Sequence, residues 1–205
     1  MIYEVRTYQV NTGSLAEVEK RFGEAYEHRK KYSPLAGFFH TELGPLNEII
    51  HVWPYESHAE REKVRAAAAK DANWPPKIQE FIRTMQSEIF IKAPFCPEVK
   101  PGKLGPYFEV REYTFKAGSL PAILERWGEK LPGRLKFSPI AFCGSSDFGT
   151  ANKWIHVWPY ESLDQRNSVR AQARDAGAWP PGAPPGTFLT QHSKIVMPSA
   201  FSPLQ

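Results

Sequence analysis

The sequence predicts an α+β protein made of two tandem copies of one small unit. Three segments of the first half return in the second half at a constant offset of 105 residues. Residues 51–57 return letter for letter at 156–162, Glu-Val-Arg at 4–6 returns at 109–111, and Trp-Pro-Pro at 74–76 returns at 179–181. A period of about 100 residues is too long for a solenoid and indicates two copies of one domain fused head to tail.

Alternating residues, helix-start signals and turn residues predict the same order of elements in each copy. Ser14-Leu15-Ala16-Glu17 and Ser57-His58-Ala59-Glu60 have the form of capping boxes, which predicts that a helix begins at each. In the first copy we expect strand 2–10, helix 15–32, strand 35–43, strand 48–53, a second helix from 58 that includes Val64 and Ala68, and strand 85–91. This β-α-β-β-α-β order is that of a ferredoxin-like unit.

The 205 residues suit two domains of about 100 residues each. We expect the first repeat at residues 1–92 and the second at 107–205, with a C-terminal tail. Residues 93–106 form a Pro-rich linker, which is expected to be semi-extended.

A ferredoxin-like unit carries both helices on one face of its sheet and leaves the other face bare. Two units can cover each other's bare faces and so close a barrel-like core. Because Val5, Ile50 and Val52 are apolar, we expect them to face the helices. The residues of the alternate phase are then expected to point into the shared interior: Glu4, Arg6, Tyr8, His51 and Trp53.

Composition argues against several classes of protein. The net charge of +4 is small and the basic residues are scattered among acids, so we expect no nucleic-acid partner. No apolar run approaches the length of a membrane span, and no signal peptide is expected. Cys96 and Cys143 do not occupy matching repeat positions, which argues against a shared metal or disulfide design, and a reducing cytoplasm is the expected location.

Several of these motifs together resemble one family. The strand at residues 3–8, Gly13-Ser14-Leu15 and the segment 51–55 are similar to the NIPSNAP family, and Tyr113, Gly118 and residues 156–160 repeat the pattern. The resemblance covers nearly the whole chain as two tandem domains. It implies the dimeric α+β barrel fold, whose superfamily also holds cofactor-independent monooxygenases, haem-degrading enzymes and ligand-binding proteins. It brings no catalytic residues, so it indicates the fold far better than the function.

His51 and His156 are the most suggestive titratable candidates. An imidazole between aromatic residues can act as a general base or ligate haem, and it can equally be a core histidine bonded to Glu4 or Tyr8. No metal site is predicted, because no metal-ligand spacing accompanies the two histidines. No cofactor is predicted, and haem remains the alternative.

Each repeat also carries a carboxylate and a guanidinium two residues apart, Glu4 with Arg6 and Glu109 with Arg111. Each pair can serve acid–base chemistry and anion binding, or can be a buried ion pair that sets strand register. The aromatic candidates for lining a ligand pocket, or for simple core packing, are Tyr8, Trp53, Tyr113 and Trp158.

The arginines of the second helix have a plainer expected role. Arg61 and Arg65, with their copies Arg166 and Arg170, are expected on a solvated helix face or in ion pairs with Glu56 and Glu161.

Two functional hypotheses follow. In the first, the repeats pair within the chain or between chains, and the barrel interior holds a small apolar or aromatic molecule, with or without catalysis. In the second, the chain is a non-catalytic interaction protein whose loops recruit partners. An open cavity with an available imidazole would favour the first hypothesis, and a filled interior with bonded histidines would favour the second.

Overall fold

The computed structural model describes residues 1–98 and 100–205. Within them, each half of the chain has the predicted β-α-β-β-α-β order. The first repeat contains β1 (Ile2–Val10), α1 (Leu15–Arg29), β2 (Gly37–Leu43), β3 (Glu48–Tyr55), α2 (His58–Ala68) and β4 (Ile82–Lys92). The second contains β5 (Tyr107–Phe115), α3 (Leu120–Arg134), β6 (Phe142–Phe148), β7 (Lys153–Tyr160), α4 (Leu163–Asp175) and β8 (Phe188–Pro198).

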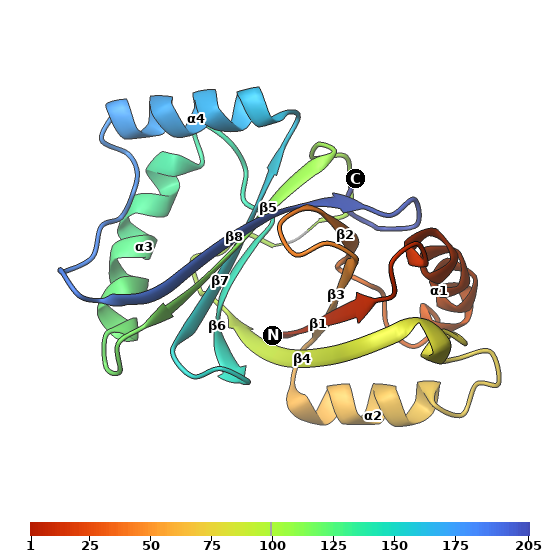
Figure 1. Cartoon of the computed structure of the whole chain (residues 1–205). Coiled ribbons are helices and arrows are strands. Elements are labelled where there is room, and N and C mark those ends of the chain that lie inside the picture. The colour runs from red at the N-terminus through yellow and green to blue at the C-terminus, as the bar shows by residue number, and fades with distance from the viewer. Residues whose placement is uncertain (99) are drawn as a thin grey trace.

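The strands form one closed antiparallel barrel. Its order is β1-β3-β2-β8-β5-β7-β6-β4, so each repeat supplies a four-stranded sheet, and β2 pairs with β8 while β4 pairs with β6. Figure 1 shows the barrel at the centre, with α1 and α2 outside it on one side and α3 and α4 on the other. The α+β class, the two ferredoxin-like repeats and their pairing within one chain are therefore confirmed.

The barrel interior is a packed apolar core. Val5 and Ile50 of the first repeat meet Val110 and Ile155 of the second in one buried cluster. The pocket that the described residues leave there has a volume of only about 30 Å³. The interior therefore stabilises the pairing of the repeats and leaves no room for a ligand, so the expectation of a binding site inside the barrel is wrong.

The expected sidedness of the strands is also wrong. His51 lies under α1, with its ring 4.9 Å from that of Phe22, while Val5 and Ile50 face the barrel interior. The alternation grouped the residues correctly and assigned the two groups to the wrong faces. The physical reason is that both faces of each sheet are buried, one by helices and one by the other sheet. Apolar residues therefore do not distinguish the helix-facing side from the interior-facing side.

The second helix of each repeat begins as predicted. The hydroxyl of Ser57 accepts a hydrogen bond from the Glu60 amide at 3.2 Å, and Ser162 accepts one from Gln165 at 3.0 Å. The capping box predicted at Ser14 is absent, because the Ser14 hydroxyl instead donates to the Asn11 carbonyl at 2.6 Å. Helix α1 nevertheless begins at Leu15 and ends at Arg29, three residues before the predicted end at 32.

Each repeat sends the segment after its last strand onto the other repeat. Phe201 of the C-terminal tail packs against Phe38, with ring centroids 4.7 Å apart. The start of the segment predicted to be a semi-extended linker packs on the second repeat, where the Sγ atom of Cys96 accepts a hydrogen bond from the Cys143 amide at 3.1 Å. Val99 of that linker lies outside the described residues. The two repeats thus interlock beyond the barrel strands.

Candidate functional site

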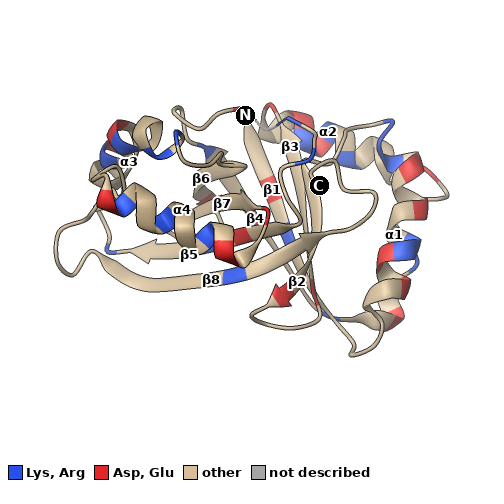
Figure 2. Cartoon of the chain, turned by 90° about the horizontal axis from the view of Figure 1, so that it is seen from above, with Lys and Arg blue, Asp and Glu red and all other residues tan. Residues whose placement is uncertain are grey.

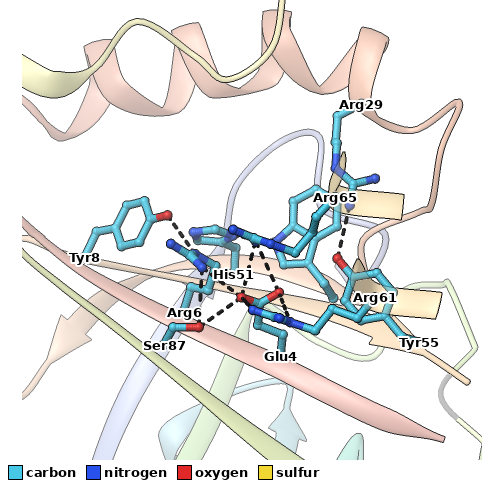
Figure 3. Close-up of polar contacts among 10 residues, drawn as sticks. Glu4, Arg6, Tyr8, Arg29, His51, Tyr55, Arg61, Arg65 and Ser87 are labelled. Atoms are coloured by element: carbon cyan, nitrogen blue, oxygen red, sulfur yellow. Dashed lines mark hydrogen bonds and ion pairs between the residues drawn. The ribbon is translucent and has the colours of Figure 1, made fainter. Parts of the chain in front are cut away.

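A buried carboxylate organises the helix-side face of the first repeat. Glu4 of β1 is fully buried and accepts hydrogen bonds from Arg6 at 2.8 Å, Arg61 at 2.8 and 3.0 Å, and Ser87 at 2.9 Å. Arg65 of α2 lies 3.4 Å from both carboxylate oxygens. Figure 3 shows these guanidinium groups converging on Glu4.

The charges around Glu4 keep it ionised. Burial by itself raises the pKa of Glu4, but the hydrogen bond from Arg61 and the charges of Arg65 and Arg6 outweigh it and hold the pKa at about 2. The alternative in which Arg61 and Arg65 pair with Glu56 is wrong, since both arginines extend from α2 to Glu4 on the helix-facing side of the sheet. Glu4 is therefore a permanent anion at neutral pH that positions three cations.

The imidazole of His51 has a defined tautomer. The indole N–H of Trp53 donates to Nδ1 of His51 at 2.7 Å. Because an indole nitrogen can only donate, Nδ1 carries a lone pair, and the proton of the neutral ring sits on Nε2. Burial and the charge of Arg6 lower the pKa of His51 well below its ordinary value, so the ring stays neutral. Among the described residues, Nε2 has no hydrogen-bond partner.

These residues line a cavity of about 520 Å³ between the sheet and the helices. Its cationic wall consists of Arg6, Arg29 and Arg65, and no Asp or Glu is among the described residues that line it. Its aromatic walls consist of Tyr8, Phe22, Trp53, Tyr55 and Trp74. The cavity therefore combines an aromatic enclosure, an excess of positive charge and the imidazole of His51.

Arg29 stands at the end of α1 and completes the cationic wall. Its guanidinium lies 4.4 Å from the ring centroid of Trp53 and donates to the Tyr55 hydroxyl at 3.1 Å. Sequence reasoning missed Arg29, Tyr55 and Arg134. The signal was available, since Arg29 returns as Arg134, and Tyr55 as Tyr160, at the same offset of 105 residues as the other matches.

The second repeat builds a similar site, in which Oε2 of Glu109 has no hydrogen-bond partner among the described residues and lies 3.6 Å from Arg170. Glu109 is fully buried and accepts from Arg111 at 2.7 Å, Arg166 at 2.6 Å and Ser193 at 2.9 Å. Burial raises the pKa of Glu109, but the hydrogen bond from Arg166 and the charge of Arg111 outweigh it and hold the pKa at about 2.

The second histidine repeats the arrangement of the first. Trp158 donates to Nδ1 of His156 at 2.6 Å, and Nε2 of His156 has no partner among the residues described. Burial and the charge of Arg111 lower the pKa of His156 well below its ordinary value. The second cavity measures about 410 Å³.

The structure thus brings together every candidate predicted from the sequence, in two matching groups. The first is Glu4, Arg6, Tyr8, His51 and Trp53, and the second is Glu109, Arg111, Tyr113, His156 and Trp158. The histidine partner is a tryptophan rather than the expected glutamate or tyrosine. The Trp-Pro-Pro segments close the cavities, with the Trp74 ring 5.9 Å from that of Trp53.

The closed barrel of two ferredoxin-like sheets, with a helix-covered site in each half, defines a dimeric α+β barrel protein formed within one chain. None of the helices described is long and apolar enough to cross a membrane. The chain belongs to the NIPSNAP family, whose model matches residues 3–97 and 108–203.

Known proteins are similar to this chain over all or about half of its length. NipSnap homolog 3A from Homo sapiens is 27% identical over 218 residues, covering 100% of this chain and 86% of that protein. The solved structure of an uncharacterized NIPSNAP domain protein from Burkholderia xenovorans is 28% identical, with a TM-score of 0.46, and covers 48% of this chain and 100% of its own.

A more distant solved structure shares the whole fold. A putative monooxygenase from Lactobacillus acidophilus has a TM-score of 0.68 at 8% identity and covers 97% of this chain and 94% of its own. At that identity the likeness shows the fold alone.

Proposed function

We propose that this chain binds a small anionic molecule with an aromatic or apolar body in each of its two helix-side cavities. The observation that carries the proposal is the imidazole Nε2–H of His51, buried and unpartnered in the wall of an aromatic cavity, and its repetition at His156. A buried donor without a partner costs stability, so a ligand that accepts from it is the simplest explanation for its presence twice.

The charge of the cavity selects the ligand class. Arg6, Arg29 and Arg65 line the first cavity, and Glu4 neutralises only part of their charge. The Nε2–H of His51 is covered by neighbouring rings, so a carboxylate or an enolate accepts from it once these rings move slightly, while the guanidinium groups stabilise the charge of the ligand. The aromatic walls and a volume of about 520 Å³ suit a planar apolar body.

The tautomer argues for binding rather than for proton abstraction. A general base needs a lone pair directed at the substrate, and the lone pair of His51 is held by Trp53. This tautomer is also unsuited to haem ligation. Nε2 can ligate iron only if its proton moves to Nδ1, and a proton there would clash with the indole N–H of Trp53. We therefore propose that His51 and His156 orient an anion and that no haem is held by them.

Solved proteins that share this fold fit the proposed ligand class. Solved structures of this fold include proteins named as putative monooxygenases, and an oriented aromatic anion is a suitable substrate for such chemistry.

Cys96 and Cys143 are free thiols, which supports the cytoplasmic location expected from the sequence.

Calorimetric titration with 2-naphthoate tests the proposal. We expect two sites per chain, of which His51→Ala removes the first and His156→Ala the second, each by weakening affinity about 10- to 100-fold. His192→Ala is the matched control, because His192 is exposed and lines neither cavity. Destabilisation of both alanine variants with unchanged titrations would instead support the interaction-protein hypothesis, in which the histidines only fill the core.

A further inference from the structure

The two cavities share most of their lining residues and differ at a few positions, several of them exposed at the mouth. The residues identical in both are the wall already described, which is Arg6, Tyr8, Arg29, His51, Trp53, Tyr55, Arg65 and the Trp-Pro-Pro segment, with their copies. Four positions that line both cavities carry different residues, namely Phe22 against Trp127, Ala69 against Arg174, Ile82 against Phe188, and Met85 against Gln191. For the last two pairs the equivalence follows the strand register, because Ser87 and Ser193 face Arg6 and Arg111 respectively.

Two of these changes alter the chemistry of the mouth. Arg174 adds a guanidinium where the first repeat has the methyl group of Ala69, and Gln191 adds an amide where the first has the thioether of Met85. Arg174 continues the row of Arg166 and Arg170 along α4, and Figure 2 shows the basic positions recurring along that helix.

Arg174 has little else to neutralise it. Its Nε lies 3.2 Å from a carboxylate oxygen of the neighbouring Asp175, but the two side chains are 68% and 70% exposed, so solvent screens the pair. Its guanidinium can therefore contact a ligand at the mouth.

The other two changes alter the space. Trp127 and Phe188 are larger than Phe22 and Ile82, and the second cavity is accordingly about 410 Å³ against about 520 Å³ for the first. A smaller cavity with an added cation and an added amide suits a compact ligand that carries a second anionic group. A larger cavity with Ala69 and Met85 at its mouth suits a bulkier ligand whose outer end is apolar.

We propose that the two sites take different ligands, a dianionic aromatic molecule in the second repeat and a monoanionic one with an apolar outer end in the first. The inference rests on the proposed function and assigns the discrimination to Arg174 and Gln191. Duplication of the unit thus gave one chain two related binding specificities.

Matched probes in single-site chains test this proposal. In His51→Ala only the second site remains, and in His156→Ala only the first. Each chain is titrated with 2-naphthoate and with 2,6-naphthalenedicarboxylate, and the ratio of the two dissociation constants is compared. We expect the ratio to favour the dianion about two- to fivefold more in the second site, the size of effect that a mostly exposed charge supplies.

Exchanging the residues at positions 69 and 174 tests the role of the added guanidinium most directly. Arg174→Ala in the His51→Ala chain should remove most of the preference, leaving the part due to Gln191, and Ala69→Arg in the His156→Ala chain should create most of it. Arg126→Ala is the control, since it removes the same charge from an exposed position of α3 that lines neither cavity.

The outcomes separate the two proposals. Binding of both probes with equal preference in the two sites, or a preference that Arg174→Ala leaves unchanged, overturns the inference and leaves the proposed function standing. No binding of either probe to folded single-site chains, with folding verified by circular dichroism, overturns both.

Discussion

A carboxylate without exposure to solvent needs compensating charge, and Glu4 and Glu109 each obtain it from arginines of a strand and a helix. These ion pairs tie α2 and α4 to the sheets beneath them. They also hold the guanidinium groups that line the cavities, so at this scale the same contacts serve stability and binding.

Glu4→Gln tests the structural part of that role. The substitution keeps the shape of the side chain and leaves Arg6, Arg61 and Arg65 without a counter-charge. We expect the free energy of unfolding, measured in urea, to fall by about 3 kcal/mol. Glu17→Gln is the control, because Glu17 forms an exposed pair with Arg21, and its urea midpoint should not change. Equal midpoints for the two variants would show that the buried cluster adds no stability.

The tautomer of the histidines can be observed directly. We expect nitrogen-15 NMR of the imidazole rings to show protonated Nε2 and unprotonated Nδ1 in both His51 and His156. Because their pKa values lie well below 6.5, neither ring should titrate between about pH 8 and 6. A titration with a midpoint near 6.5, or a proton on Nδ1, would remove the basis for an Nε2–H donor.

The sequence predicted most of the residues that form the site, but not the side of the sheet on which they lie. Period-two alternation grouped Glu4 with Arg6 and Tyr8, and the repeat singled out His51 and Trp53. Alternation cannot distinguish two faces that are both buried, so the side of the sheet was assigned wrongly. The partners of Glu4 come from α2, 57 and 61 residues away, and no local pattern specifies such contacts.

At the scale of elements, strands and helices followed the local signals closely, and the deviations have local causes. Strand β1 has its predicted bounds, whereas β4 begins three residues before the predicted 85. Between the Trp-Pro-Pro segment and β8 the second repeat carries one extra residue, since Ser193 rather than residue 192 takes the place of Ser87. That insertion lies in the irregular segment before β8, where the sequences of the repeats no longer match.

The exchanged tails lie beyond what local sequence patterns predict, and Phe201 tests their importance. Its ring packs on Phe22 of α1 and on Phe38 of β2, so Phe201→Ala should lower the free energy of unfolding by about 2 kcal/mol. Leu189→Ala, at a position that is 62% exposed on β8, should leave it nearly unchanged. If thermal melts of the two variants coincide, the tail is only loosely docked.

We expect the whole molecule to unfold as one cooperative unit, because the barrel closes through pairing of strands from different repeats. The core between the sheets buries residues of both repeats in one cluster. We therefore expect a single unfolding transition that is shared by fluorescence and circular dichroism.

Acid should destabilise this unit in a defined range. The carboxyl groups of Glu4 and Glu109 have folded pKa values of about 2, against 4.5 for the free side chain. The unfolded chain therefore takes up these protons first as the pH falls. Each group contributes about 3 kcal/mol that is fully present above about pH 5 and lost progressively between about pH 4.5 and 2.

Urea unfolding at pH 6, 4 and 3 measures this loss, and a Glu4→Gln/Glu109→Gln chain should show a much shallower decline. The same slope in both chains would assign acid sensitivity to other groups.

The central claim, that an anion binds between sheet and helices and not inside the barrel, is tested most directly by a crystal structure with 2-naphthoate. The account predicts ligand density in both helix-side cavities, with a carboxylate oxygen within hydrogen-bond distance of Nε2 of His51 and of His156. Ligand density in the barrel interior would contradict it. So would crystals soaked with saturating 2-naphthoate in which both helix-side cavities hold only water.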